Sequence, residues 1–160
     1  MSTGPKNYPE LKAGEIHSKL ANHQTARISP LNIERLMLTP EGGDWRNWPE
    51  DYLLKCHKKL LASGKSAGYT DTYGRLRKRA PACTLTTKCT SISNGRFGHP
   101  TQHRALSVRE AAALQTFDDD FKFEGTLGQT ARQVGNAVPV LFAKALGQSI
   151  FEHKEQLQNG

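Results

Sequence analysis

The residues best suited to chemistry lie between Tyr73 and Arg109, where eight Lys and Arg residues occur without a single Asp or Glu. Gly, Ser, Thr and Asn separate these cations, so the backbone can approach a phosphate chain while short side chains donate hydrogen bonds. Arg and Thr side chains on loops can also reach base edges. The stretch therefore favours a nucleic-acid interface over a basic loop that only keeps the protein soluble. The candidate phosphate or base contacts are Arg75, Arg77, Lys88, Arg96 and Arg104.

The same stretch contains residue types that bind zinc, namely Cys83, Cys89, His99 and His103. The histidine spacing suits a zinc finger, but five residues separate the cysteines and the spacer between the two pairs is short. Buried thiols and loop histidines are therefore the favoured interpretation, and no metal ligand is assigned. The chain also lacks a nucleophile–base arrangement, a GxGxxG motif and a P-loop, so no catalytic residue is assigned.

The composition limits the class of protein and its partners. The chain has 160 residues, a formal net charge of +7 and a pI near 9.5, which makes a polyanion the first partner to consider. With 36% hydrophobic residues and a mean hydropathy of −0.62, it can bury a modest core, as one domain or a small domain plus part of another. No run approaches the ~20 apolar residues of a membrane span, and the N-terminus has no apolar signal region. Three cysteines without a signal fit reduced thiols in a cytoplasm.

Two helices are predicted in the first half of the chain. Residues 29–38 predict a helix with Ser29 as its N-cap and Pro30 at its first position. Residues 49–64 predict a second helix that begins at a proline and ends at a glycine, with His57, Lys58 and Lys59 on a solvated face. The Thr-rich residues 81–88 predict a strand, and residues 93–100 predict a loop.

The second half is predicted to be more strongly helical. Ser107 and Glu110 have capping-box spacing at the start of a helix that runs to residue 117. A final helix is predicted to begin with Asn136 as its N-cap and to carry an apolar stripe of Val138, Leu141, Phe142, Ala145, Leu146 and Ile150. The free N–H groups of such a helix start suit a polar ligand, but taken alone the pattern favours a well-formed helix start without a ligand.

Two longer motifs carry a family resemblance. "RALSVREAAALQTFDDDFKF" (104–123) and "RQVGNAVPVLFAKAL" (132–146) resemble the ninth and tenth motifs of bacterial DNA (cytosine-5) methyltransferases. "NHQTARISPLNIERL", "GGDW", "YGRLRKRAPACTLTT" and "NGRFGHP" resemble one type of target-recognition domain in that family. The resemblance extends from about residue 11 to residue 150, with Asp118 where the family usually has proline.

The resemblance implies a mixed α/β (α+β) fold in two regions. Residues 1–105 are expected to form a target-recognition region of loops, short strands and helices. Residues 106–160 are expected to supply helices that complete a Rossmann-like methyltransferase domain. By resemblance, Thr84 and Leu85 match a Thr-Leu dipeptide near the flipped base, and Asn136, Ala137 and Val138 contact S-adenosylmethionine.

The family's remaining motifs are absent from this sequence. It has no glycine-rich cofactor loop, no Glu-Asn-Val, no Q-x-R-x-R and no Pro-Cys, because its three cysteines follow Lys, Ala and Lys. We therefore expect a chain that resembles the small subunit of a split enzyme. It would recognise double-stranded DNA, share the S-adenosylmethionine site with a catalytic partner chain and be inactive alone. It would be cytoplasmic, of bacterial or phage origin. The alternative is a non-enzymatic basic DNA-binding module, with or without a stabilising zinc ion.

Overall fold

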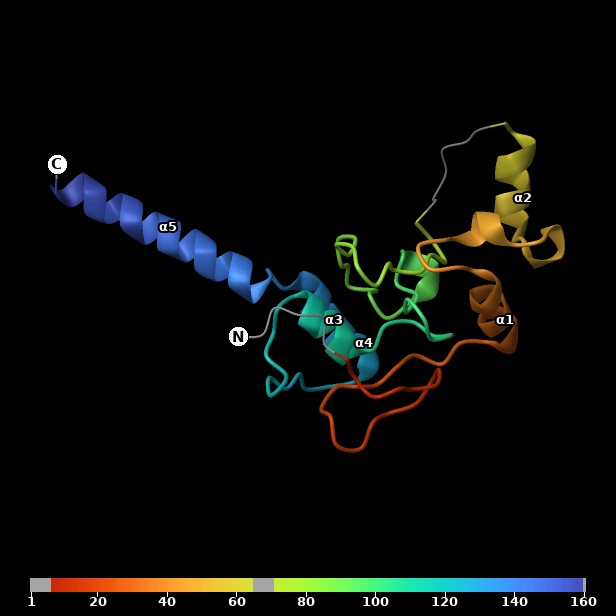
Figure 1. Cartoon of the computed structure of the whole chain (residues 1–160), viewed down its shortest axis with the longest axis horizontal. Helices are drawn as coiled ribbons and strands as arrows, with labels where there is room; N and C mark the ends of the chain where they lie inside the picture. The colour runs from red at the N-terminus through yellow and green to blue at the C-terminus, as the bar shows by residue number, and fades with distance from the viewer. Residues whose placement is uncertain (1–6, 65–70, 160) are drawn as a thin grey trace.

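The chain forms a loop-rich body from which one long helix projects (Figure 1). A computed structural model describes residues 7–64 and 71–159. Its helices are α1 (Pro30–Leu38), α2 (Lys55–Ala62), α3 (Val108–Leu114), α4 (Leu127–Asn136) and α5 (Val140–Asn159), with 3-10 turns at Trp45–Asn47, Glu50–Tyr52 and Ile92–Asn94. Helix α5 leaves the body at one end of the long axis, and α2 lies at the opposite end.

Regular β-structure is nearly absent, so the mixed α/β expectation is only partly met. Within the described residues, β-pairing is limited to three isolated bridges, Ile16 with Gln24, Arg75 with Gly98, and Gly98 with Ala105. The predicted strand at 81–88 is wrong, because residues 81–86 are irregular and a turn follows at 87–90. A strand needs a neighbouring strand to take its hydrogen bonds. This segment instead lies against helix α4, where a Cβ on Gly135 would clash with the backbone carbonyl of Thr86.

The two predicted helices of the first half have different outcomes. Helix α1 is confirmed, with the Ser29 side chain accepting a hydrogen bond from the Asn32 N–H. The helix predicted from residue 49 is wrong in its first part, where a 3-10 turn is followed by two extended residues before α2 starts at Lys55. His57 lies in the interior, stacked on Trp45 at a ring-centroid distance of 4.2 Å, and not on a solvated face. Nδ1 of His57 also accepts from the backbone N–H of Leu54, the N-cap residue of α2, at 3.4 Å.

The helices of the second half begin and end at caps. Helix α3 is confirmed in place, with the predicted capping box between Ser107 and Glu110. Helix α4 is not among the predicted helices, although Thr126 and Gln129 form a capping box that the sequence displays. Asn136 is the last residue of α4 and not the N-cap of the final helix, which begins at Val140. Pro139 explains this break, because a residue before proline favours an extended backbone and proline donates no N–H.

The main core lies between α3, α4 and the loops that precede them. It draws residues from both sides of residue 105, so the two expected regions share one apolar cluster. A smaller cluster under α1 is formed by Leu36, Ile92 and Ala105, with Ile28 and Tyr73 beside it. The main cluster consists of Cys89, Phe97, Val108, Ala111, Ala112, Phe123, Ala131 and Val134.

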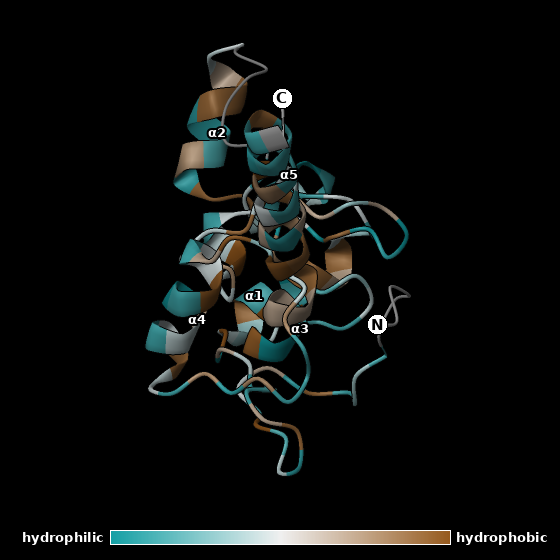
Figure 2. Ribbon diagram, turned by 90° about the vertical axis from the view of Figure 1, so that its left-hand side faces the viewer, coloured by the Kyte–Doolittle hydropathy of each residue, from teal (hydrophilic) through white to brown (hydrophobic). Residues whose placement is uncertain are grey.

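Helix α5 contributes nothing to either core. Its apolar residues Leu141, Phe142, Leu146 and Ile150 are 38%, 62%, 52% and 63% exposed, and Figure 2 shows apolar turns along the free helix. Among the described residues, the stretch Leu127–Gln158 is long and apolar enough to cross a membrane by length and composition alone. That stretch is not one continuous helix, because it breaks between Asn136 and Val140, and its α4 part packs against α3.

Candidate nucleic-acid interface and cofactor edge

Arg75 lies inside the body and not on its surface. The side chain is buried, and its guanidinium donates to the carbonyl oxygens of Leu36, Thr39, His99 and Gln102 at 2.6–3.2 Å. It also contacts Nδ1 of His103 at 2.6 Å. With every nitrogen of the guanidinium directed at this shell, Arg75 ties α1 to the 99–103 loop. The structure therefore gives it a scaffolding role, and we withdraw it as a DNA contact.

Arg104 is also withdrawn as a DNA contact. It has no exposed surface, and its two terminal nitrogens donate to the two carboxylate oxygens of Glu110, each at 2.7 Å. Its Nε donates to the carbonyl of Leu11 and to the side chain of Gln102. Burial alone would raise the pKa of Glu110, but the hydrogen bonds and charge of Arg104 outweigh it and lower that pKa. The ion pair fastens the N-terminal segment to the start of α3.

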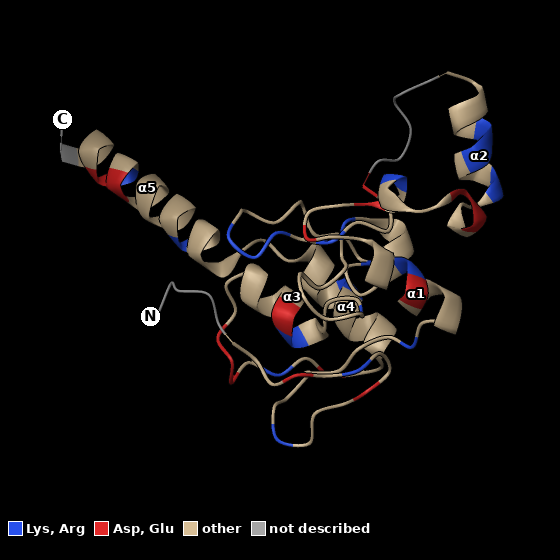
Figure 3. Cartoon of the chain, turned by 45° about the vertical axis from the view of Figure 1, so that its right-hand side comes forward, with Lys and Arg blue, Asp and Glu red and all other residues tan. Residues whose placement is uncertain are grey.

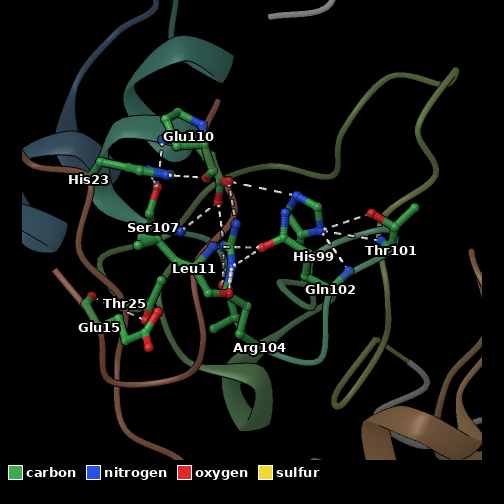
Figure 4. A network of polar contacts seen from close by, with 12 residues as sticks. Leu11, Glu15, His23, Thr25, His99, Thr101, Gln102, Arg104, Ser107 and Glu110 are labelled. Atoms are coloured by element: carbon green, nitrogen blue, oxygen red, sulfur yellow. Dashed lines mark hydrogen bonds and ion pairs between the residues drawn. The ribbon is translucent and has the colours of Figure 1, made fainter. Parts of the chain in front are cut away.

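Two histidines complete this buried network (Figure 4). Nδ1 of His99 accepts from the backbone N–H of Gln102, and its Nε2 lies 3.6 Å from a Glu110 carboxylate oxygen. Burial lowers the pKa of His99 to about 4, although the Glu110 carboxylate opposes the shift. His23 is fully buried between the hydroxyl of Ser107 and the carbonyl of Pro9. The network holds together segments that are far apart in the sequence.

Arg96 is half-buried and supports a loop. Its guanidinium donates to the carbonyl oxygens of Gly42 and Gly43, and it lies 3.4 Å from the carboxylate of Asp44. The exposed edge of its side chain remains accessible. Arg96 thus stays a candidate DNA contact that also holds the 42–44 turn.

The exposed cations form the accessible part of the predicted interface. Figure 3 shows blue segments on the loop that carries Arg77, Lys78 and Arg79 and along α2. Arg77 and Lys88 are exposed, and Leu85 is packed against the main core beside Thr84. A second basic surface consists of Lys55, Lys58 and Lys59 on α2, so the predicted solvated face is confirmed for Lys58 and Lys59, although the sequence did not indicate it as a binding surface. Lys58 lies 3.8 Å from Glu50, an exposed pair that contributes little.

The Thr-Leu segment and the Gly-Asn motif lie against each other. Gly135 has no room for a side chain, because a Cβ at this position would clash with backbone atoms of Thr86 and Thr87. Only glycine permits this close approach. The predicted base-side segment and the predicted cofactor segment therefore share one contact, which the sequence alone did not reveal.

Asn136, Ala137 and Val138 form an accessible edge between α4 and α5. The side chain of Asn136 makes no hydrogen bond to another described residue, and Val138 is 57% exposed. A free amide, which donates and accepts, next to an apolar side chain fits one edge of a site for S-adenosylmethionine. The three residues fit such a group as part of a wall and not as a complete pocket.

A cavity of about 740 Å³ lies elsewhere, between the N-terminal segment, α3 and the basic loop. Arg77, Lys78, His99 and Glu110 are among its lining residues, and none of residues 136–138 lines it. Its cations and acids are mixed, so its chemistry selects no ligand class.

The four candidate zinc ligands do not converge. Sγ of Cys89 contacts the carbonyl of Ala131 at 3.6 Å, and Sγ of Cys83 lies 3.8 Å from the carbonyl of Arg96. Burial raises the pKa of both thiols, which opposes the thiolate form that binds metal. Over residues 7–64 and 71–159, no group of three or more His, Cys, Asp or Glu side chains is placed to hold a metal ion.

These features define a small basic protein with a loop-built cationic surface, a helix junction and a bare apolar helix. The chain belongs to the C-5 cytosine-specific DNA methylase family, whose model matches residues 6–152. It is 44% identical over 139 residues to the type II methylase M.HgiDII of Herpetosiphon aurantiacus, a match that covers 84% of this chain and 38% of that protein.

Other relatives show the same partial coverage. The type II methyltransferase M.PspPI of Psychrobacter sp. (strain TA137) is 37% identical over 88% of this chain and 33% of its own length. DNA (cytosine-5)-methyltransferase 3 of Arabidopsis thaliana is 35% identical over 83% of this chain and 10% of its own length. The chain thus spans about a third of the length of the two bacterial relatives.

Proposed function

We propose that this chain supplies DNA sequence recognition and one edge of the S-adenosylmethionine site to a cytosine-5 DNA methyltransferase. In this proposal, residues 1–105 act as the target-recognition region and residues 106–160 complete the catalytic domain. A partner chain contributes the Pro-Cys nucleophile and the glycine-rich cofactor loop, which this sequence lacks. The two act together in the cytoplasm, as part of a bacterial or phage-encoded modification system.

The observation that carries the proposal is the bare apolar face of α5. Four large apolar side chains on a single helix are 38–63% exposed, although the rest of the chain has a packed core. A helix with such a stripe buries it against another element. The motif that begins α5 belongs to the part of the chain matched by the family model. The partner chain is therefore the occupant that we assign to this face.

The roles in DNA contact and cofactor orientation are assigned to residues of this chain. Arg77, Lys88 and the exposed edge of Arg96 contact DNA phosphates or base edges. Thr84 and Leu85 lie near the cytosine, which must leave the base stack for chemistry on its ring. Asn136 orients the cofactor, which supplies the methyl group when bound. No residue of this chain is assigned to covalent catalysis.

The test is reconstitution from separate chains. The chain should be incubated with labelled S-adenosylmethionine and varied DNA duplexes, alone and with the chain encoded beside it. We expect incorporation at cytosine C5 only in the mixture, together with a stable complex in a pull-down. Incorporation by this chain alone would contradict the assignment of the nucleophile to a partner. If the neighbouring gene encodes no Pro-Cys and glycine-rich motifs, and no other chain restores activity, the proposal fails.

A further inference from the structure

The end of α3 is joined to both sides of the break between α4 and α5. The Nε2 amide of Gln115 donates to the carbonyl oxygens of Val134 and Ala137, both at 3.1 Å. The backbone carbonyl of Gln115 accepts from the N–H of Val140 at 3.1 Å. The hydroxyl of Thr116 accepts from the N–H of Leu141 at 2.9 Å. Two consecutive residues thus hold the last carbonyls of one helix and the first N–H groups of the next.

Three of these four hydrogen bonds satisfy groups that the break would otherwise leave unpaired, whereas the carbonyl of Val134 also accepts from the N–H of Ala137 at 3.2 Å. The first N–H groups and the last carbonyls of a helix have no partners within it. Pro139 prevents α4 from continuing into α5, so the partners must come from outside. Gln115 is buried at this position, which makes the loss of its side chain costly for the carbonyls it serves.

Thr116 has the left-handed backbone conformation that ends α3, because its N–H donates to the carbonyl of Ala113 and the N–H of Phe117 donates to the carbonyl of Ala112. Its φ angle is +60°, in the left-handed region where a β-branched residue is strained. Glycine would adopt this conformation without strain, but it has no hydroxyl to accept from Leu141. Thr116 therefore ends α3 and, unlike glycine, also supplies the acceptor for the Leu141 N–H.

We infer that Gln115 and Thr116 are positioning residues that hold Asn136, Ala137 and Val138 at a fixed angle to α5. The inference rests on the proposed function, because it gives the clamped segment its role as a cofactor edge. If α5 docks on the partner chain, the clamp fixes where Asn136 stands relative to the rest of the cofactor site. Losing the clamp would then loosen cofactor binding without touching the DNA-binding surface.

The first arm of the test uses the chain alone and measures hydrogen exchange at the Leu141 amide. Thr116→Val keeps the shape of the side chain and removes the acceptor, whereas Thr116→Ser keeps the hydroxyl. We expect exchange at this amide to be about fivefold faster or more in Thr116→Val and close to wild type in Thr116→Ser. Equal exchange in all three proteins would overturn the clamp.

The second arm uses the complex with the partner chain and titrates S-adenosylhomocysteine, the unreactive product of methyl transfer. We expect about fivefold weaker binding for Thr116→Val and for Gln115→Glu, which turns the amide donor into an acceptor, with DNA affinity unchanged. Thr116→Ser should restore the wild-type affinity, which a general loss of folding would not allow.

Two outcomes separate this inference from the proposed function. If exchange changes but S-adenosylhomocysteine affinity does not, the clamp serves only the fold and the positioning role is overturned. If the wild-type complex does not bind S-adenosylhomocysteine, or Asn136→Ala binds it as wild type does, the proposed cofactor edge itself fails. A drop in DNA affinity equal to the drop in cofactor affinity would also contradict the inference.

Discussion

The body of the chain and helix α5 differ in how far their side chains are buried and paired. In the described part of the body, every buried side-chain nitrogen and oxygen has a hydrogen-bond partner, even around the fully buried Arg104 and Arg109. The guanidinium of Arg109, for example, donates to the carbonyls of Ala21, Asp118 and Phe121. Helix α5, in contrast, leaves its apolar side chains in solvent. The buried polar groups of the body are all paired, whereas the apolar face of α5 is covered by no other described part of this chain.

The largest effect is expected from placing negative charge on the apolar face of α5. Leu141→Asp combined with Leu146→Asp removes two side chains, each of which contributes roughly 1.5–3 kcal/mol when buried, and places carboxylates in the contact. We expect the double variant to lose the partner in a pull-down. Its free energy of unfolding alone should fall by no more than about 2 kcal/mol, because the side chain of Leu146 is 52% exposed and that of Leu141 is 38% exposed.

The matched control adds the same charge to the same helix outside its apolar stripe. Lys144→Asp changes the charge of α5 by the same two units on the opposite face of the helix and should keep the partner. If circular dichroism shows that the double Leu variant unfolds the isolated chain, α5 packs within this chain. The central argument for a partner would then be lost.

The next largest effect is expected in the body, from breaking the buried ion pair. Arg104→Met keeps the apolar volume but leaves Glu110 buried without its main partner, a change that typically costs about 3–5 kcal/mol. Chemical denaturation should show a loss of that order. The control Arg77→Met alters an exposed arginine of the same acid-free stretch and should change stability by less than about 0.5 kcal/mol. Equal effects would mean that burial does not distinguish the two arginines.

The difference between the buried and the exposed arginines shows which features of the structure could be predicted from the sequence. Local signals predict the starts of α1 and α3 correctly, since the caps at Ser29 and Ser107 depend only on residues three positions away. Whether Arg75 and Arg104 are buried depends on carbonyl and carboxylate groups that folding brings together. One of these groups is the carbonyl of Leu11, which lies 93 residues away from Arg104 in the sequence. A charge count cannot separate a buried cation from an exposed one.

The helix boundaries show the same division. The period of the apolar stripe predicts α5, but its predicted start is misplaced because Asn136 is also a plausible N-cap. Pro139 lies in the break that the clamp of Gln115 and Thr116 brackets, and not within the first turn of the helix. His57 is buried because its stacking partner, Trp45, is provided by a turn outside its own helix. The family could be recognised from the sequence, because the residues of each motif follow one another in the chain.

The buried network is expected to make the stability of the chain depend on pH. The pKa of His99 is about 4 in the folded chain and about 6.5 when unfolded, so the unfolded state binds the extra proton first as pH falls. Stability should therefore be constant above pH 6.5 and fall by at most about 3 kcal/mol between pH 6.5 and 4. The lowered pKa of Glu110 acts in the same direction at the acid end.

The measurement is the melting temperature between pH 7.5 and 4, for wild type and His99→Gln. Gln keeps an acceptor for the neighbouring backbone N–H groups and does not titrate. We expect a shallower fall for His99→Gln, with the remainder coming from other histidines whose pKa is lowered by burial, including His23 and His57. Parallel curves would show that His99 is not a source of the pH dependence.

The smallest effect is expected from the exposed cations, and it is measured as salt dependence rather than stability. The side chains of Arg77 and Lys88 are exposed, and both project from loops of the acid-free stretch. Each phosphate contact contributes about 0.9 to the slope of log affinity against log salt. Arg77→Gln with Lys88→Gln should therefore flatten the slope by about 1.8 in the complex if both residues contact phosphates.

The control for this slope removes the same charge from another part of the surface. Lys12→Gln with Lys19→Gln alters the exposed N-terminal segment and should leave the slope unchanged. If Arg77 instead contacts a guanine, its replacement costs about 1–3 kcal/mol at one base position only. Equal slopes for both double variants would show that general charge, and not this loop, sets DNA affinity. In that case the exposed cations of the body would be no more specific than those of the N-terminal segment, and sequence recognition would have to come from the half-buried Arg96 or from the partner chain.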